Sequence, residues 1–128
     1  ETSPVEISPS GSAHLENIIN LNAARELCGD KDERVRMLAE TLLQEAKDLL
    51  IALHAAIEDE DIATIRRNAH SLKGAAAVFG ATNVVDAARG IESLSAEEKV
   101  DEIDASFNEL SGHVEKLVAA LEQVIAST

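Results

Sequence analysis

The C-terminal stretch VDEIDASFNELSGHVEKLVAALEQV, residues 100–124, carries the strongest periodic signal in the chain. Its apolar residues follow one another at alternating spacings of three and four, the repeat of one face of an α-helix. Just before it, Ser95 and Glu98 have the spacing of a capping box, which typically starts a helix. The pattern predicts one long amphipathic helix whose buried face carries Val100, Ile103, Phe107, Leu110, Val114, Leu117, Leu121 and Val124.

Two further helices are predicted near the N-terminus. The longer one starts at Asp30 and Glu33, an acidic variant of the capping box, and runs to about Glu58. A short helix over residues 22–28 precedes it and is capped by Asn22. The apolar stripe of the longer helix consists of Val35, Leu38, Leu42, Leu49, Leu53 and Ile57.

The middle of the chain predicts two more helices. The first covers about residues 62–79 and meets Gly80, which favours a C-terminal stop. Thr82 can then cap a helix that ends near Leu94. The apolar positions of this last helix are Val84, Val85, Ala88 and Ile91.

The composition favours an all-α fold. Of 128 residues 45% are hydrophobic, but only two are Phe and none is Trp or Tyr, so smaller aliphatic residues must fill the core. Strands draw on aromatic residues between frequent Gly and Pro turns, which this chain lacks. Short loops between four long helices predict an up-down antiparallel four-helix bundle with a short extra N-terminal helix. We expect this domain to cover residues 14–128, after a flexible linker at residues 1–13.

The charge of the chain excludes several classes of partner. Eleven Lys and Arg stand against 24 Asp and Glu, and a formal net charge of −13 repels nucleic acid and anionic lipid. No apolar run approaches the roughly 18 residues of a membrane helix, so no direct membrane insertion is expected. The single cysteine, Cys28, cannot form an internal disulfide. We therefore expect a cytoplasmic monomer that does not depend on an oxidising compartment.

Any chemistry has to be sought among the histidines, because the sequence has no Gly-rich phosphate loop, zinc-ligand spacing or nucleophile elbow. There are four: His14, His54, His70 and His113. On a helical wheel at about 100° per residue, His70 lies well outside the apolar arc of its helix and is predicted to be exposed. That arc consists of Ile62, Ile65, Ala69, Leu72, Ala76 and Phe79.

Small side chains surround His70 on the wheel, those of Ala63, Gly74 and Ala77. An interior Gly costs a helix about 1 kcal/mol relative to Ala, and close approach of another protein is a reason to keep Gly74. Arg66 and Lys73 lie to one side, where their cations can hold the charge of a phosphoryl group. Geometry alone leaves a second interpretation open, in which His70 is a solvated surface histidine.

The string AHSLKGAAAVFGA, residues 69–81, resembles the signature of the histidine-phosphotransfer (HPt) family. In that family the phosphorylated histidine is followed three residues later by Lys and then by Gly. The resemblance covers roughly residues 17–126 and includes the short first helix, the Cys28-Gly29-Asp30 turn and the Ile91-Glu92 pair.

The resemblance implies a role for each matching residue. His70 would be the phosphoacceptor, whose Nε2 takes a phosphoryl group from an aspartyl phosphate and later gives it to another aspartate. Lys73 would steady the phosphoryl oxygens, and Gly74 would keep the approach open. In the family a Glu or Gln 22 residues beyond the histidine often accepts a hydrogen bond from Nδ1, which indicates Glu92, although a solvated carboxylate remains the alternative. The partner would contact Ala63, Arg66, Arg67, Ala77 and Arg89.

The same resemblance implies the partners. They are the receiver domains of response regulators and an upstream histidine kinase. The domain would carry phosphoryl groups without autonomous kinase activity, either alone or as part of a hybrid sensor kinase in the cytoplasmic portion of a membrane-bound receptor. The Mg²⁺ used in transfer would belong to the receiver, so we expect no metal site and no cofactor on this chain.

Three alternatives stay open. A non-catalytic helical interaction module would leave apolar residues unused after its core is built, for example on the last helix. A degenerate HPt domain would bind receivers without accepting phosphate. A di-metal carboxylate enzyme would need Glu-x-x-His pairs that face inward on two helices, and none lies on a core face. His54 and Glu58 have a four-residue spacing but no third ligand, so His54, like His14 and His113, is interpreted as a surface histidine.

Overall fold

The computed structural model describes residues 18–127. Over this range the chain forms helices joined by short turns, without strands. The predicted linker, residues 1–13, and His14 lie outside the described range. The helices are α2 (Leu21–Leu27), α3 (Asp32–Glu58), α4 (Ile62–Val78), α5 (Thr82–Ala96) and α6 (Val100–Ser127).

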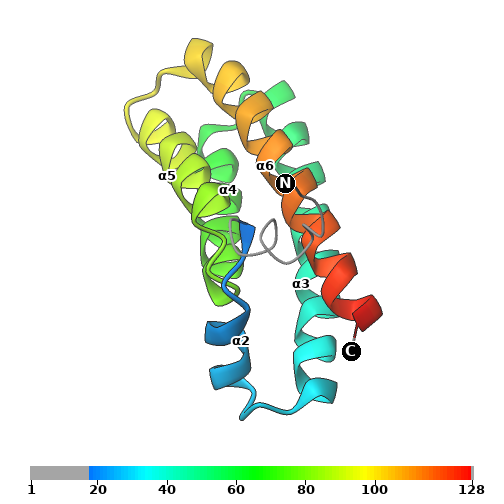
Figure 1. Ribbon diagram of the computed structural model, residues 1–128. Coiled ribbons are helices and arrows are strands. Elements are labelled where there is room, and N and C mark those ends of the chain that lie inside the picture. The colour runs from blue at the N-terminus through cyan, green and yellow to red at the C-terminus, as the bar shows by residue number, and fades with distance from the viewer. Residues whose placement is uncertain (1–17, 128) are drawn as a thin grey trace, which may run out of the picture.

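The four long helices form a closed ring in which each runs antiparallel to its neighbours (Figure 1). α3 packs against α4, α4 against α5, and α5 against α6, which returns to α3. α3 extends beyond the end of α4, and α2 packs against that extension. The predicted all-α up-down bundle with a short N-terminal helix is thus confirmed.

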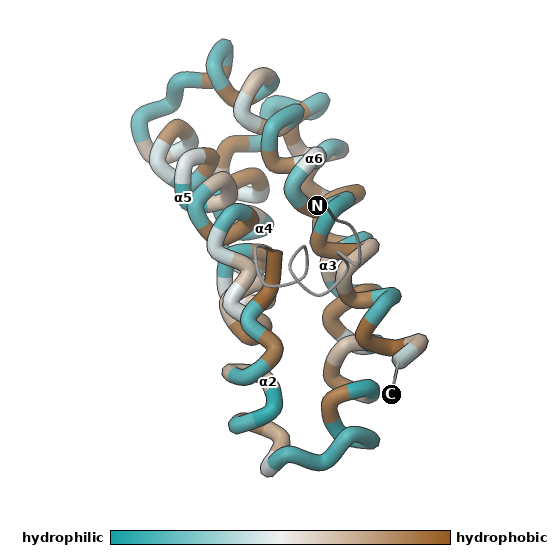
Figure 2. Tube along the Cα trace, viewed as in Figure 1, coloured by the Kyte–Doolittle hydropathy of each residue, from teal (hydrophilic) through white to brown (hydrophobic). Residues whose placement is uncertain are grey.

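The core lies along the axis of this ring and is built from aliphatic side chains and Phe79. Apolar segments recur along every long helix (Figure 2), as the spacing predicted. Of the stripe predicted on α6, Val100 and Phe107 are partly buried and the other six residues are buried. The largest fully buried side chains besides Phe79 are those of Leu53, Ile65, Leu72, Ile91, Ile103, Leu110, Leu117 and Leu121.

The helices α2 to α5 all end in a left-handed residue that closes a Schellman motif. In α4 this residue is Gly80, with φ +63°, and the N–H of Ala81 donates to the carbonyl of Ala76 at 3.0 Å. α3 and α5 use Glu60 and Glu98 instead, with φ +54° and +57°. A left-handed conformation costs a residue with a Cβ about 1–2 kcal/mol, so these two turns carry backbone strain.

Gly80 also meets a second constraint. The segment before α2 crosses the end of α4, where the N–H of Asn20 donates to the carbonyl of Phe79. A Cβ on Gly80 would lie 2.7 Å from the Cβ of Asn20. The predicted stop at Gly80 is confirmed, and it is a point where only glycine fits.

The turns also set where the next helix begins, because each long helix starts two residues after a left-handed residue. Asp30 has φ +60°, so the predicted capping box of Asp30 and Glu33 is wrong and α3 begins at Asp32 after the N-cap Lys31. Thr82 does not cap α5 but is its first residue, after the N-cap Ala81.

Two further predicted helix boundaries are wrong. α2 is capped by Asn20, whose Oδ1 accepts from the N–H of Ala23 at 3.1 Å, and Asn22 lies inside the helix. Ser95 does not open a capping box for α6. It is buried in the last turn of α5, where its hydroxyl donates to the carbonyl of Ile91 at 2.8 Å, and α5 therefore continues past Leu94 to Ala96.

The helix α4 has the clearest side-chain cap among the long helices, although sequence reasoning did not single it out. One carboxylate oxygen of Asp61 accepts from the N–H of Thr64 at 3.3 Å, and the other accepts from its hydroxyl at 2.7 Å. These hydrogen bonds lower the pKa of Asp61. Because the carboxylate also stabilises the positive end of the helix, α4 has a well-defined start.

The core packing predicts how two isoleucines will differ. Ile65 of α4 is fully buried, whereas Ile51 of α3 is 70% exposed. We expect Ile65→Ala to lower the free energy of unfolding by about 2–5 kcal/mol, because the substitution leaves a cavity. Ile51→Ala should change it by no more than about 0.5 kcal/mol. Urea denaturation followed by circular dichroism measures both, and equal losses would contradict the packing described here.

Candidate functional site

His70 lies near the middle of α4 and is well exposed, with 68% of its side chain accessible to solvent. The arc predicted to be buried turns inward: Ile65, Ala69, Leu72, Ala76 and Phe79 are buried, and Ile62 is partly buried. Since those residues anchor α4 in the core, the imidazole must stand on the outer surface of the bundle.

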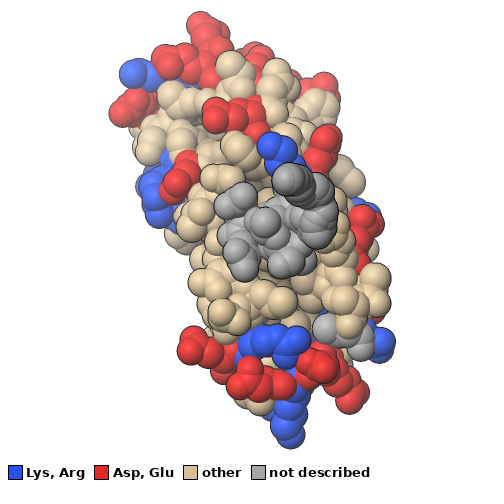
Figure 3. Space-filling view, viewed as in Figure 1, with Lys and Arg blue, Asp and Glu red and all other residues tan. Residues whose placement is uncertain are grey.

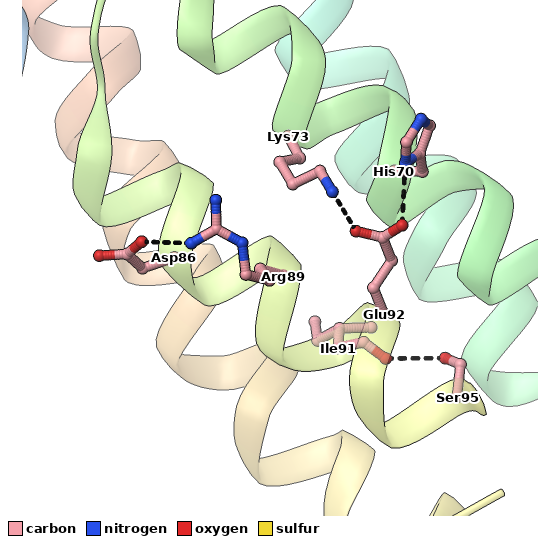
Figure 4. Close-up of polar contacts among 7 residues, drawn as sticks. All are labelled: His70, Lys73, Asp86, Arg89, Ile91, Glu92 and Ser95. Carbon is pink, nitrogen blue, oxygen red and sulfur yellow. Dashed lines mark hydrogen bonds and ion pairs between the residues drawn. The ribbon is translucent and has the colours of Figure 1, made fainter. Parts of the chain in front are cut away.

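Glu92 of α5 reaches across to α4 and contacts two side chains at once (Figure 4). Its Oε2 lies 2.8 Å from Nδ1 of His70, and its Oε1 lies 2.7 Å from Nζ of Lys73. A carboxylate can only accept hydrogen bonds, so Nδ1 is the donor, and in the neutral ring Nε2 keeps its lone pair. The exposed ring therefore presents a nucleophilic nitrogen to the surroundings.

The Glu92 carboxylate is held in its ionised form. Only 19% of its side chain and 25% of that of Lys73 is exposed. The hydrogen bond from Lys73 is the main reason why the pKa of Glu92 lies below its ordinary value of 4.5. Burial acts in the opposite direction, and the hydrogen bond from His70 lowers the pKa further.

The surface around the histidine is open. Ala63, Gly74 and Ala77 are all exposed on α4. No atom lies within 4 Å of the position that a Cβ on Gly74 would take, so packing inside the chain does not require glycine there. The open space at Gly74 therefore allows another molecule to approach His70 from the solvent.

Basic side chains gather beside the site in a chain that is otherwise acidic. α4 contains Arg66, Arg67 and Lys73 but no Asp or Glu. Arg66 and Arg89 line a cleft between α4 and α5 together with Glu92. Elsewhere acidic groups dominate, and in Figure 3 they crowd the end of the bundle where α5 meets α6.

The arginines differ in how they are held. Arg89 pairs with Asp86 at 3.1 Å, and Nη2 of Arg67 donates to the hydroxyl of Thr64 at 3.4 Å. Arg66 makes no ion pair with the part of the chain that the structure describes, and its guanidinium is exposed. The three arginines therefore lie at the edge of the site, whereas Lys73 contacts Glu92 directly.

Sequence reasoning missed the groove on the other side of His70. It runs between α3 and α4, next to the site, and no local pattern in either helix indicates it. Its walls are formed by Thr41, Gln44, Glu45, Asp48, Leu49, Ala52 and Ser71.

The other described histidines have different surroundings. His54 stacks on Phe107, with ring centroids 5.3 Å apart, and its Nε2 is 3.7 Å from Glu58. His113 lies 3.8 Å from Glu109. Within residues 18–127, no three His, Cys, Asp or Glu side chains come together as a metal site would require. None of the helices in that range is long and apolar enough to cross a membrane.

The shared carboxylate predicts a measurable pH effect. Because the pKa of Glu92 is lowered by folding, its ionised form stabilises the fold above its ordinary pKa, and this contribution is lost as the pH falls through the lowered value. We expect Lys73→Met to raise the pKa of Glu92 toward 4.5, as followed by carboxyl carbon NMR. Lys116→Met removes an equivalent charge from α6, which packs beside α3 and α5 rather than α4, and should leave the titration unchanged. If Lys73→Met left the pKa of Glu92 unchanged, the hydrogen bond from Lys73 would not be the reason why that pKa is low.

Comparison with known proteins shows the family and the fold. The model of the Hpt domain family matches residues 37–126. The crystal structure of histidine-containing phosphotransfer protein B (HptB) from Pseudomonas aeruginosa PAO1 superposes with a TM-score of 0.80 at 18% identity, over 86% of this chain and 96% of that one. The HPT domain of a sensor hybrid histidine kinase from Shewanella gives a TM-score of 0.74 at 21% identity, over 90% and 97% of the two chains. A comparison with curated proteins found no significant match. With its bundle, its exposed histidine and a family match over most of its length, the chain belongs to the Hpt domain family.

Proposed function

We propose that this histidine-phosphotransfer domain carries its phosphoryl group on Nε2 of His70 and exchanges it with aspartates of response-regulator receivers. Phosphotransfer in a two-component phosphorelay is the function of the family. The observation that carries the assignment to His70 is the contact between its Nδ1 and Glu92 at 2.8 Å on an otherwise exposed ring. That contact supports a fixed tautomer with Nε2 free to react.

The reaction balances with the groups at this surface. The Nε2 lone pair of His70 forms the N–P bond while the P–O bond of the aspartyl phosphate breaks, and its electrons leave on the aspartate carboxylate. Nδ1 keeps its proton, so the ring gains a positive charge. Glu92, ionised and in contact with Nδ1, stabilises that charge as it develops.

The surroundings of His70 favour a protein as the phosphoryl donor. Ala63, Gly74 and Ala77 leave room for a receiver to bring its aspartate within reach of the ring. Receivers bind Mg²⁺ through carboxylates, and the cations of Arg66, Arg67 and Arg89 complement such an acidic pocket. The metal would remain with the receiver, so this domain needs no cofactor of its own, and an upstream histidine kinase would supply the phosphoryl group through a receiver.

The alternative of a non-catalytic interaction module has less support. Among the described residues three large apolar side chains are well exposed, those of Leu27, Met37 and Ile51, and none of them is on α6. The apolar stripe of α6 is used within the bundle, so it is not free to pair with a second chain.

The assignment of His70 has a direct test. Incubation with a phosphorylated receiver should label the domain with a phosphate that is labile in acid and stable in base, and His70→Gln should abolish the label. His113→Gln, on a helix that does not pack beside α4, should be labelled like the wild type. The proposal would be contradicted if the His70→Gln variant were labelled. It would also be contradicted if no receiver of the same cell labelled the wild-type domain.

The role of Gly74 is tested with a matched glycine. Gly74→Gln should slow transfer from a receiver by about tenfold or more, because it displaces the partner from His70. Gly112→Gln places the same side chain in α6, at an exposed helical glycine that also has open space around it. Stopped-flow transfer rates should fall for the first variant alone, with helix content alike in both. Similar rates in the two variants would remove close approach as the reason for Gly74.

A further inference from the structure

Lys73 and His70 share one carboxylate, and both oxygens of that carboxylate are occupied. The two side chains are three residues apart on α4, and Glu92 joins them from α5 at 2.7 and 2.8 Å. The ammonium of Lys73 is therefore not free in solvent before a phosphoryl group arrives. In the unphosphorylated domain its ammonium is paired, and the group of Lys73, Glu92 and a neutral His70 has no net charge.

Phosphorylation upsets this balance. The ring becomes positive, and the phosphoryl group on Nε2 brings about two negative charges. The phosphoryl group is a stronger anion than the carboxylate that Lys73 contacts, while Glu92 then has a second cation, the ring, beside it. The flexible four-carbon stem of a lysine allows its ammonium to move between such neighbours.

Within residues 18–127, Lys73 is the only Lys or Arg side chain that pairs with Glu92. On α4 the nearest are Arg66, at the cleft, and Arg67, which contacts Thr64. On α5, Arg89 is paired with Asp86. On α3, the charged residues that line the groove beside Ser71 are Glu45 and Asp48, which are acidic.

We propose that Lys73 changes partner during transfer, leaving Oε1 of Glu92 for the phosphoryl oxygens on His70. The exchange stabilises both charges that phosphorylation creates, one on the phosphoryl group and one on the ring. It neutralises charge on the phosphoryl group, and it leaves Glu92 with the ring as its one charged partner when the ring becomes positive. Return of Lys73 to Glu92 after transfer restores the neutral group. This inference rests on the proposed function of His70.

The exchange can be followed without a receiver. The small donor phosphoramidate phosphorylates exposed histidines, His54 among them, so the phosphorus NMR signal that is missing in a His70→Gln domain is the one that reports modification of His70. The lysine ammonium signals of the domain, labelled with nitrogen-15, report what Lys73 contacts. Glu92→Gln should shift the Lys73 signal clearly in the unphosphorylated domain but have little effect once His70 is phosphorylated. Lys99, paired with Glu97 at 3.2 Å, is the control signal and should stay constant throughout.

A lysine that remains on Glu92 gives the opposite result, since its signal would respond to Glu92→Gln equally before and after phosphorylation, and that result would overturn the exchange. Failure of phosphoramidate to modify His70 would appear in the phosphorus spectrum instead, and it would overturn the proposed function together with this inference. The two failures are therefore distinguishable.

A double-mutant cycle supplies a second readout. If Lys73 acted only by positioning Glu92, Lys73→Met would have no further effect on phosphorylation by phosphoramidate once Glu92 is Gln. Under the exchange, Lys73→Met should slow phosphorylation of the Glu92→Gln domain by at least about tenfold, because the ammonium contacts the phosphoryl group itself. Equal rates of the Glu92→Gln domain and the double variant would contradict the proposal. Circular dichroism confirms that each variant is folded.

Discussion

The helices α4 and α5 pack against each other, and the buried face of each includes alanine. Ala69 and Ala76 on α4 and Ala88 on α5 are completely buried. The distance between packed helices depends on the side chains at their contact, and small ones allow close approach. A glutamate on α5 can therefore span the gap and reach the outer surface of α4. A larger residue at the buried position Ala69, directly before His70, would displace α4 and disturb the contact between His70 and Glu92. The chemistry of an exposed histidine thus depends on how small its buried neighbours are.

Periodicity predicted which segments are helical and which residues are buried, because burial is repeated along a helix and a single exception does not hide the pattern. It did not locate the helix starts. Capping boxes at Asp30 and Ser95 satisfied the sequence rules, but the left-handed residues that close the preceding turns determine the first residue of each helix. Asp30 is itself one of those residues, and Ser95 bonds within its own helix. The backbone hydrogen bonds of the Schellman motifs therefore determined the helix starts, and the capping-box side chains did not.

For the site, the sequence was sufficient to predict an exposed His70 with small neighbours, since all of these lie on one helix and a wheel relates them. The family resemblance, rather than spacing, indicated Glu92. Neither could predict that Lys73 would bind Glu92, because the two residues lie 19 positions apart on different helices and their contact depends on the distance between α4 and α5. The groove beside Ser71 was missed for the same reason, as its walls come from two helices.

The strained turns at Glu60 and Glu98 lie at the same end of the bundle, where α3 joins α4 and α5 joins α6. Glu97, Glu98, Asp101 and Glu102 add like charges there. Strain and repulsion therefore coincide at that end, and both favour local opening there. Glu92 is only one turn from the end of α5, so fraying there would detach it from His70 before the rest of the bundle unfolds. The lifetime of a phosphoryl group on this domain is thereby coupled to the local stability of the end where α5 joins α6.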